Sequence, residues 1–102
     1  MLYTITNYFS DDLPSSIFDE EKQKFIDFFV KDGHGVLKEL IVNEKVPLAY
    51  KIKNKLSIRE LIMIVDVEPK VINSYSSFVG RNDNVLRWLV EKISKDNSKK
   101  IK

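Results

Sequence analysis

The segment at residues 56–75 constrains the fold more than any other part of the chain, because it contains two start signals for helices. Ser57 is followed three residues later by Glu60, a spacing in which the two side chains cap the first turn of a helix reciprocally. Pro69 suits the first turn of a helix, where its missing N–H group costs nothing, so a second helix begins at position 68 or 69. With a tight turn at positions 66–67, the segment predicts a helix-turn-helix.

The second of these helices is expected to bury one face and expose the other. Val71, Ile72 and Tyr75 are spaced as i, i+1 and i+4, which places them on one apolar face. The residues that point outward are polar and form hydrogen bonds readily: Lys70, Asn73, Ser74 and Ser77. In a helix-turn-helix, side chains at such positions reach base edges in the major groove of DNA.

This segment resembles the phage-repressor-like family of helix-turn-helix DNA-binding proteins. The residues that match its pattern are Leu56-Ser57, Glu60-Leu61, Asp66-Val67, Glu68-Pro69, Ile72 and Tyr75. The resemblance implies that bases or phosphates are contacted by Pro69, Lys70, Asn73, Ser74 and Ser77. It also implies that Ser57 or Arg59 lies near the DNA backbone.

Met63 and Ile64 fall on positions that are normally solvated in that family. If both are exposed while Leu61 and Val65 are buried, they form an apolar patch of the kind that marks an interface. We expect such a patch to be the seam of a homodimer, which would also supply the two half-sites that these proteins bind.

A rival interpretation takes residues 58–67 as a strand, because Leu-Ile-Met-Ile-Val is continuously apolar and rich in β-branched residues. The chain would then be α+β, and the argument for DNA binding would fail. A further alternative keeps the motif but makes residues 78–85 a hairpin, as in a winged helix.

Elsewhere the chain also favours helices. Ser16 and Asp19 predict a capping box for a helix that runs to Val30, and Gly33 supplies a left-handed stop. Further helices are predicted at residues 36–42, where a strand is the alternative, at 47–52 and, capped by Asn82 or Asp83, at 85–93. The weak alternation of residues 3–9 allows a short strand.

These elements predict a mainly α fold, a small helical bundle in one globular domain over residues 1–93. Residues 94–102 read as a flexible basic tail, because they hold too few apolar groups to order themselves. A chain of 102 residues with 43% apolar content has room for one core and no second domain.

Charge is distributed unevenly along the chain. Residues 1–50 hold nine acidic and five basic side chains, a balance of −4, whereas residues 51–102 hold six and twelve, a balance of +6. A positive surface of this kind is typical of phosphate binding. The basic residues expected to meet phosphates are Lys51, Lys53, Lys55, Arg59, Arg81, Lys99, Lys100 and Lys102.

Other functions are excluded by what the chain lacks. It has no cysteine and one histidine, and His34 lies between two glycines as a solvated loop residue, so we expect no enzyme, no metal site and no cofactor. The N-terminal segment lacks a basic lead and a cleavage site, and no apolar run approaches the roughly 18 residues that span a bilayer. We therefore expect a cytoplasmic protein without a membrane segment.

Two hypotheses of function follow. The first is a small transcriptional regulator that binds double-stranded DNA through the helix-turn-helix. The alternative is an adaptor or inhibitor module that binds another protein through the apolar patch and the acidic first half of the chain.

Overall fold

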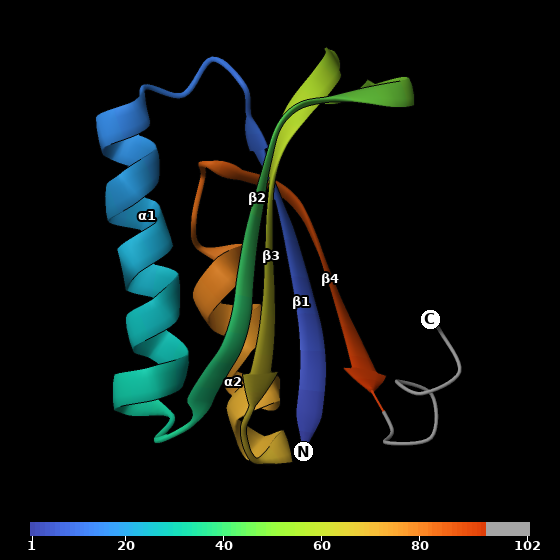
Figure 1. The fold of residues 1–102 in the computed structure, drawn as a ribbon. Coiled ribbons are helices and arrows are strands. Elements are labelled where there is room, and N and C mark those ends of the chain that lie inside the picture. Colours follow the sequence, from blue (N-terminus) through green and yellow to red (C-terminus); the bar gives the residue numbers. More distant parts are fainter. Residues whose placement is uncertain (94–102) are drawn as a thin grey trace.

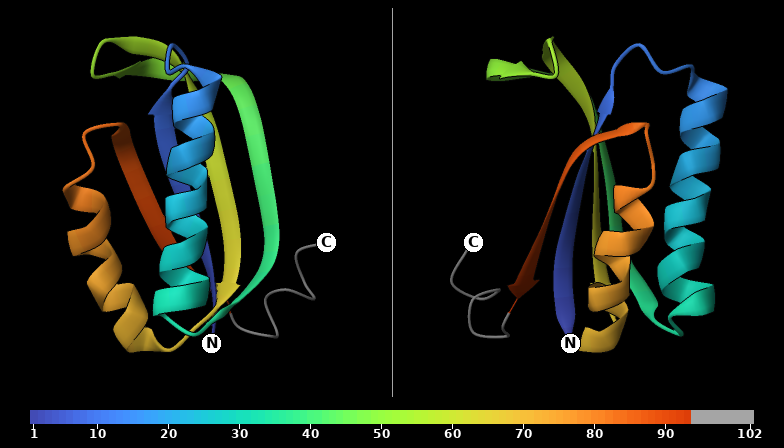
Figure 2. Two further views of the ribbon diagram at one scale, coloured as in Figure 1. Left: turned by 90° about the vertical axis from the view of Figure 1, so that its left-hand side faces the viewer. Right: turned by 180° about the vertical axis from the view of Figure 1, so that it is seen from behind.

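The computed structural model describes residues 1–93 and shows an α+β fold (Figure 1). Its four strands form one antiparallel sheet in the order β2-β3-β1-β4. The elements in chain order are β1 Leu2–Ser10, α1 Ser15–Asp27, one π-helical turn Phe28–Asp32, β2 Val36–Ile52, β3 Lys55–Asp66, α2 Pro69–Gly80 and β4 Val85–Ile93. This is the split β-α-β arrangement in which both helices pack on one face of the sheet (Figure 2).

The first helix of the predicted helix-turn-helix is instead strand β3, so the mainly α prediction is wrong and the strand interpretation is confirmed. Leu61, Met63 and Val65 alternate as fully buried residues on the helix side, while Ile62 and Ile64 are half-buried on the other face. A continuous apolar run suits β3 because it lies between β2 and β1: the helices cover one of its faces, and Ile62 and Ile64 on the other face are half-buried among neighbouring strands.

The predicted capping box is wrong because both of its side chains bind elsewhere. The Ser57 hydroxyl donates to Asp11 Oδ2 in the β1–α1 loop, and Glu60 accepts from Asn43 Nδ2 on β2. These partners lie 46 and 17 residues away in the sequence, so no local pattern could reveal them.

Helix α2 begins at Pro69 with Glu68 at the N-cap, as predicted. Val71 and Tyr75 are buried on its inner face, also as predicted, and Val79 joins them. Its partner is the sheet and not a second helix of a DNA-binding motif. The helix runs on to Gly80, so the alternative of a wing at residues 78–85 is wrong as well.

Three more predicted helices are strands: residues 36–42 and 47–52 belong to β2, and residues 85–93 form β4. The strand predicted at residues 3–9 is confirmed within β1. Helix α1 has Pro14 at its N-cap and no side-chain capping bond, so the Ser16 capping box is wrong. The left-handed residue after the π-helical turn is His34 with φ 54°, not Gly33, whose φ is −89°.

An aromatic cluster fills the space between the sheet and the helices. Phe25 makes edge-to-face contacts with Phe9 and Tyr75, and Phe28 stacks on Phe78 with ring centroids 4.5 Å apart. The cluster joins α1, the π-helical turn and α2 to β1, so the two helices are held in place over the sheet. No helix in residues 1–93 is long and apolar enough to cross a membrane.

Candidate nucleic-acid interface

The hairpin between β2 and β3 extends past the other strands as an arm, which we define as residues 45–58 (Figures 1 and 2). Its tip is a two-residue turn in which Lys53 and Asn54 both have positive φ, 48° and 67°. That is the backbone of a type I′ turn, whose twist matches that of the two strands. Lys45 is a third residue with positive φ, 51°, where the register between the strands shifts.

The arm is cationic and contains no acidic residue. Lys45, Lys51 and Lys53 are exposed. Lys55 is not free, because its ammonium group contacts Asp12 Oδ2 at 2.5 Å. That hydrogen bond, with the attraction between the charges, lowers the pKa of Asp12 and raises the pKa of Lys55. Three lysines therefore remain to meet an external anion.

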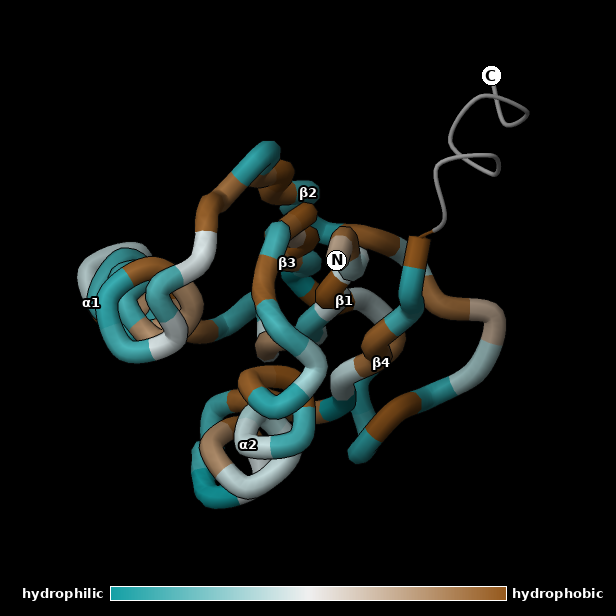
Figure 3. Tube along the Cα trace, turned by 90° about the horizontal axis from the view of Figure 1, so that it is seen from below, coloured by the Kyte–Doolittle hydropathy of each residue, from teal (hydrophilic) through white to brown (hydrophobic). Residues whose placement is uncertain are grey.

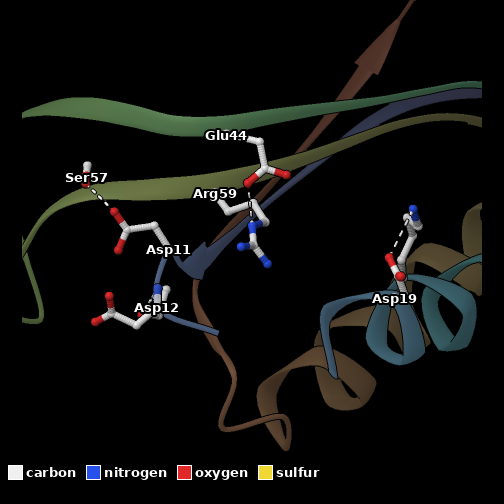
Figure 4. Close-up of polar contacts among 8 residues, drawn as sticks. Asp11, Asp12, Asp19, Glu44, Ser57 and Arg59 are labelled. Carbon is white, nitrogen blue, oxygen red and sulfur yellow. Dashed lines mark hydrogen bonds and ion pairs between the residues drawn. The ribbon is translucent and has the colours of Figure 1, made fainter. Parts of the chain in front are cut away.

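A group of polar contacts fastens the base of the arm to the body of the domain (Figure 4). Arg59 is only 7% exposed, and its Nε donates to Glu44 Oε1 at 2.8 Å. Its guanidinium group lies 4.7 Å from the centre of the Phe18 ring in α1. On the other side, Asp11 points to Ser57. Strands β2 and β3, helix α1 and the β1–α1 loop thus all help to hold the arm.

The structure gathers one half of the predicted DNA-binding residues and separates the other half. The half at the arm and its base comprises Lys51, Lys53, Lys55, Ser57 and Arg59. The half on and after α2 comprises Pro69, Lys70, Asn73, Ser74, Ser77 and Arg81. The arm leaves one end of the sheet, whereas α2 begins at the opposite end (Figure 1). The predicted DNA-binding residues therefore form no single surface that could enter a groove of DNA.

Individual predicted roles also change. Arg59 is buried in the ion pair and cannot reach a phosphate, and Lys70 lies beside Glu68 at 3.6 Å. Met63 is fully buried and Ile64 is half-buried on the opposite face of β3, so together they form no exposed patch for a dimer. The tail residues Lys99, Lys100 and Lys102 lie outside the described residues.

Sequence reasoning missed Lys45 and Tyr50, the second of which is 68% exposed on the arm. A signal was present, because residues 45–55 hold four lysines and a tyrosine with no acid among them. Interpreting this stretch as part of a helix concealed that these residues stand on a projecting hairpin.

The face of the sheet opposite the helices is open in the described part of the chain (Figure 3). Strand register aligns four residues in one row across this face: Ile41, Ile62, Thr6 and Leu89. Leu89 is 54% exposed and lines a pocket together with Thr6, Tyr8 and Arg87. The row is a largely apolar band, and Ile64 extends the apolar area on the same face of β3.

The crystal structure of the 30S ribosomal protein S6 from Thermotoga maritima has the same fold, with a TM-score of 0.88 and 11% sequence identity. The match covers 96% of this chain and 92% of that one. No curated protein matches the sequence.

A family model, ribosomal protein S6, matches residues 3–92. It replaces the predicted membership in a phage-repressor-like family, and the predicted function of a regulator that binds double-stranded DNA is wrong. Members of the matched family are structural components of the ribosome, so the protein is not an enzyme, as predicted. Because the match spans nearly all of the described residues, the chain belongs to the ribosomal protein S6 family.

Proposed function

We propose that this protein is a component of the small ribosomal subunit in the cytoplasm, where its arm binds ribosomal RNA. The observation that carries the proposal is the set of three exposed lysines on a hairpin with no carboxylate of its own. Lysines on such a projection neutralise phosphates and release counterions, which is the main source of affinity for nucleic acids. The 30S origin of the similar Thermotoga structure supports the same assignment.

The open face of the sheet supports a second contact, with a neighbouring protein of the subunit. In RNA-recognition sheets of this strand order, bases stack on aromatic residues of the central strands. Here the corresponding faces of β1 and β3 present Thr4, Thr6, Ile62 and Ile64, and their one aromatic residue, Tyr8, is half-buried beside Leu89. This mostly aliphatic surface favours burial against another apolar surface over stacking with bases. The alternative prediction of a protein-binding module is therefore kept as a contact between the open face and a neighbouring protein.

Sedimentation tests the assignment to the ribosome. A tagged copy produced in the source cell is expected to travel with the small subunit in a sucrose gradient at low salt. Replacing Lys45, Lys51 and Lys53 with glutamine should release it at lower salt, because each lost phosphate contact reduces the salt slope by about 0.7 to 0.9.

A matched control removes the same charge from exposed lysines of the helical side. It carries glutamine at Lys24, Lys31 and Lys70. This variant should sediment like the unmodified chain. A tagged chain that stays at the top of the gradient at every salt concentration, or an equal loss in both variants, would refute the proposal.

The protein contact has its own test. Leu89→Glu places a charge on the apolar band of the open face and should lower incorporation into the subunit while leaving the fold intact, because Leu89 is already more than half exposed. Val30→Glu is the control, since Val30 is an exposed apolar residue on the helical side. Equal incorporation of the two variants would exclude the open face as a docking surface.

A further inference from the structure

Tyr50 is the most exposed aromatic residue in the described chain. Its side chain is 68% exposed, against 38% for Trp88, and most of the other aromatic residues are buried or half-buried in the core. It lies on the part of β2 that belongs to the arm, away from the aromatic cluster under the helices. An aromatic ring left in water on a projecting hairpin is available to a ligand.

The surroundings of Tyr50 indicate what kind of ligand fits. Lys51 follows it directly, Lys53 lies at the tip of the arm, and Lys45 lies at the register shift on the same strand. No carboxylate lies within the arm, and the acids that contact the arm or its base, Asp11, Asp12 and Glu44, are engaged by Ser57, Lys55 and Arg59. A planar ring among free cations suits a ligand that is both aromatic and anionic, and a nucleotide is both.

The exposed ring of Tyr50 also indicates whether the nucleotide is paired or unpaired. In an A-form duplex the bases are stacked on each other, and a protein meets mainly phosphates and 2′-hydroxyl groups. The arm lysines alone would be enough to bind the phosphates of such a duplex. An exposed ring contributes only when a base is splayed out of its stack and can lie on it, which happens in loops, bulges and ends.

We propose that Tyr50 is a stacking platform for an unpaired base of RNA, with the phosphates on either side of that base held by the arm lysines. This inference rests on the proposed function, because it names the class of RNA that the arm would bind. The type I′ turn and the contacts at the base of the arm hold the backbone of the arm in place before binding, so little backbone order is lost when the base arrives.

The test compares two synthetic RNAs of equal length and charge, one fully paired and the other with an internal loop of unpaired adenosines. Affinities of the full chain are measured by fluorescence anisotropy at several salt concentrations. Stacking on one aromatic residue corresponds to a preference of about 5- to 150-fold for the looped RNA. Tyr50→Phe should keep this preference, and Tyr50→Ser should abolish it without changing the salt slope.

Leu56→Ser is the matched control, because Leu56 is similarly exposed, at 61%, and stands on the other strand of the arm. It should keep the preference for the looped RNA. If Leu56→Ser loses as much as Tyr50→Ser, the ring acts as a general apolar contact, and the platform is overturned. It is also overturned if Tyr50→Ser weakens both RNAs equally or neither.

The lysines separate this inference from the function on which it rests. Lys51→Gln should weaken both RNAs alike and reduce the salt slope, since it removes a phosphate contact. Salt-sensitive binding that shows no preference between the RNAs preserves the proposed function and rejects the platform. An absence of salt-sensitive binding to either RNA counts against both.

Discussion

Replacing Tyr75 with phenylalanine tests a buried hydrogen bond that links α2 to the central part of the sheet. The Tyr75 hydroxyl donates to Asn7 Oδ1 at 2.5 Å, and both side chains are fully buried. Asn7 Nδ2 is already without a partner among the described residues. Removing the hydroxyl leaves the whole amide unpaired in the core, and an unsatisfied buried group costs about 1–3 kcal/mol.

We therefore expect Tyr75→Phe to lower the free energy of unfolding by about 2 kcal/mol. For a domain of this size, that loss corresponds to a fall in Tm of about 8–16 °C. Urea denaturation followed by the fluorescence of Trp88, the single tryptophan, measures the change directly. The slope of unfolding free energy against urea should stay constant, because the surface exposed on unfolding hardly changes.

A double-mutant cycle identifies the cause. Asn7→Val alone leaves the Tyr75 hydroxyl unpaired, whereas Asn7→Val with Tyr75→Phe removes every polar atom of the pair. The double variant should lose less stability than the sum of the two single losses, with a coupling of about 1 kcal/mol or more. Additive losses, or a loss below about 0.5 kcal/mol for Tyr75→Phe, would falsify the claim that the hydrogen bond between Tyr75 and Asn7 stabilises the fold.

The same hydroxyl gives the fold a pH dependence of known sign. Burial is the main cause that raises the pKa of Tyr75 above its ordinary value of 10.0. The folded state keeps the proton while the unfolded chain loses it above pH 10, so this contribution to stability is constant below pH 10 and declines at higher pH. Tyr75→Phe should show a smaller decline between pH 10 and 11, measured by urea denaturation.

Two further predictions concern two glycines and the contact between Lys55 and Asp12. Gly35→Ala would place a methyl carbon 2.2 Å from Val67 Cγ1 and should lower the free energy of unfolding by about 1–3 kcal/mol. In Gly80→Ala the new methyl carbon meets its nearest neighbour at 3.9 Å, so this variant should not be destabilised. Thermal denaturation that finds Gly80→Ala less stable than Gly35→Ala would contradict this packing. Lys55→Met should raise the pKa of Asp12 toward its ordinary 3.8, measured by NMR titration. In the unmodified chain the lowered pKa of Asp12 stabilises the fold above pH 3.8, and this stabilisation is lost as the pH falls through the pKa of Asp12 in the folded state. Lys55→Met should remove this stabilisation. A pKa of Asp12 that does not move would exclude the contact between Lys55 and Asp12.

The sequence alone determined those elements whose signals are local. Pro69 defines the start of α2 because a missing N–H group is tolerated only in the first turn. The phenylalanines of α1 and the pair Val71 and Tyr75 identify buried helix faces by their spacing. The absence of cysteine and the shortage of histidine were enough to argue against an enzyme.

Strand β3 could not be distinguished from a helix in the same way. Strand β3 carries apolar residues on its half-buried face as well as on its buried face, so residues 61–65 lack the alternation in sequence that marks a strand with one polar face. The capping signal of Ser57 and Glu60 then favoured a helix, and it was outweighed by partners on other elements. Local propensity amounts to a few tenths of a kcal/mol per residue, whereas burial of one large apolar side chain stabilises by about 1.5–3 kcal/mol.

The arm was decided by the tertiary structure alone. Its lysines and Tyr50 are visible in the sequence, but their common surface exists only because β2 and β3 pair beyond the end of the sheet. The contacts that fasten its base join residues 15 to 46 positions apart. The sequence specifies the type of each side chain. The direction in which a side chain points depends on long-range pairing of strands, which no local pattern encodes.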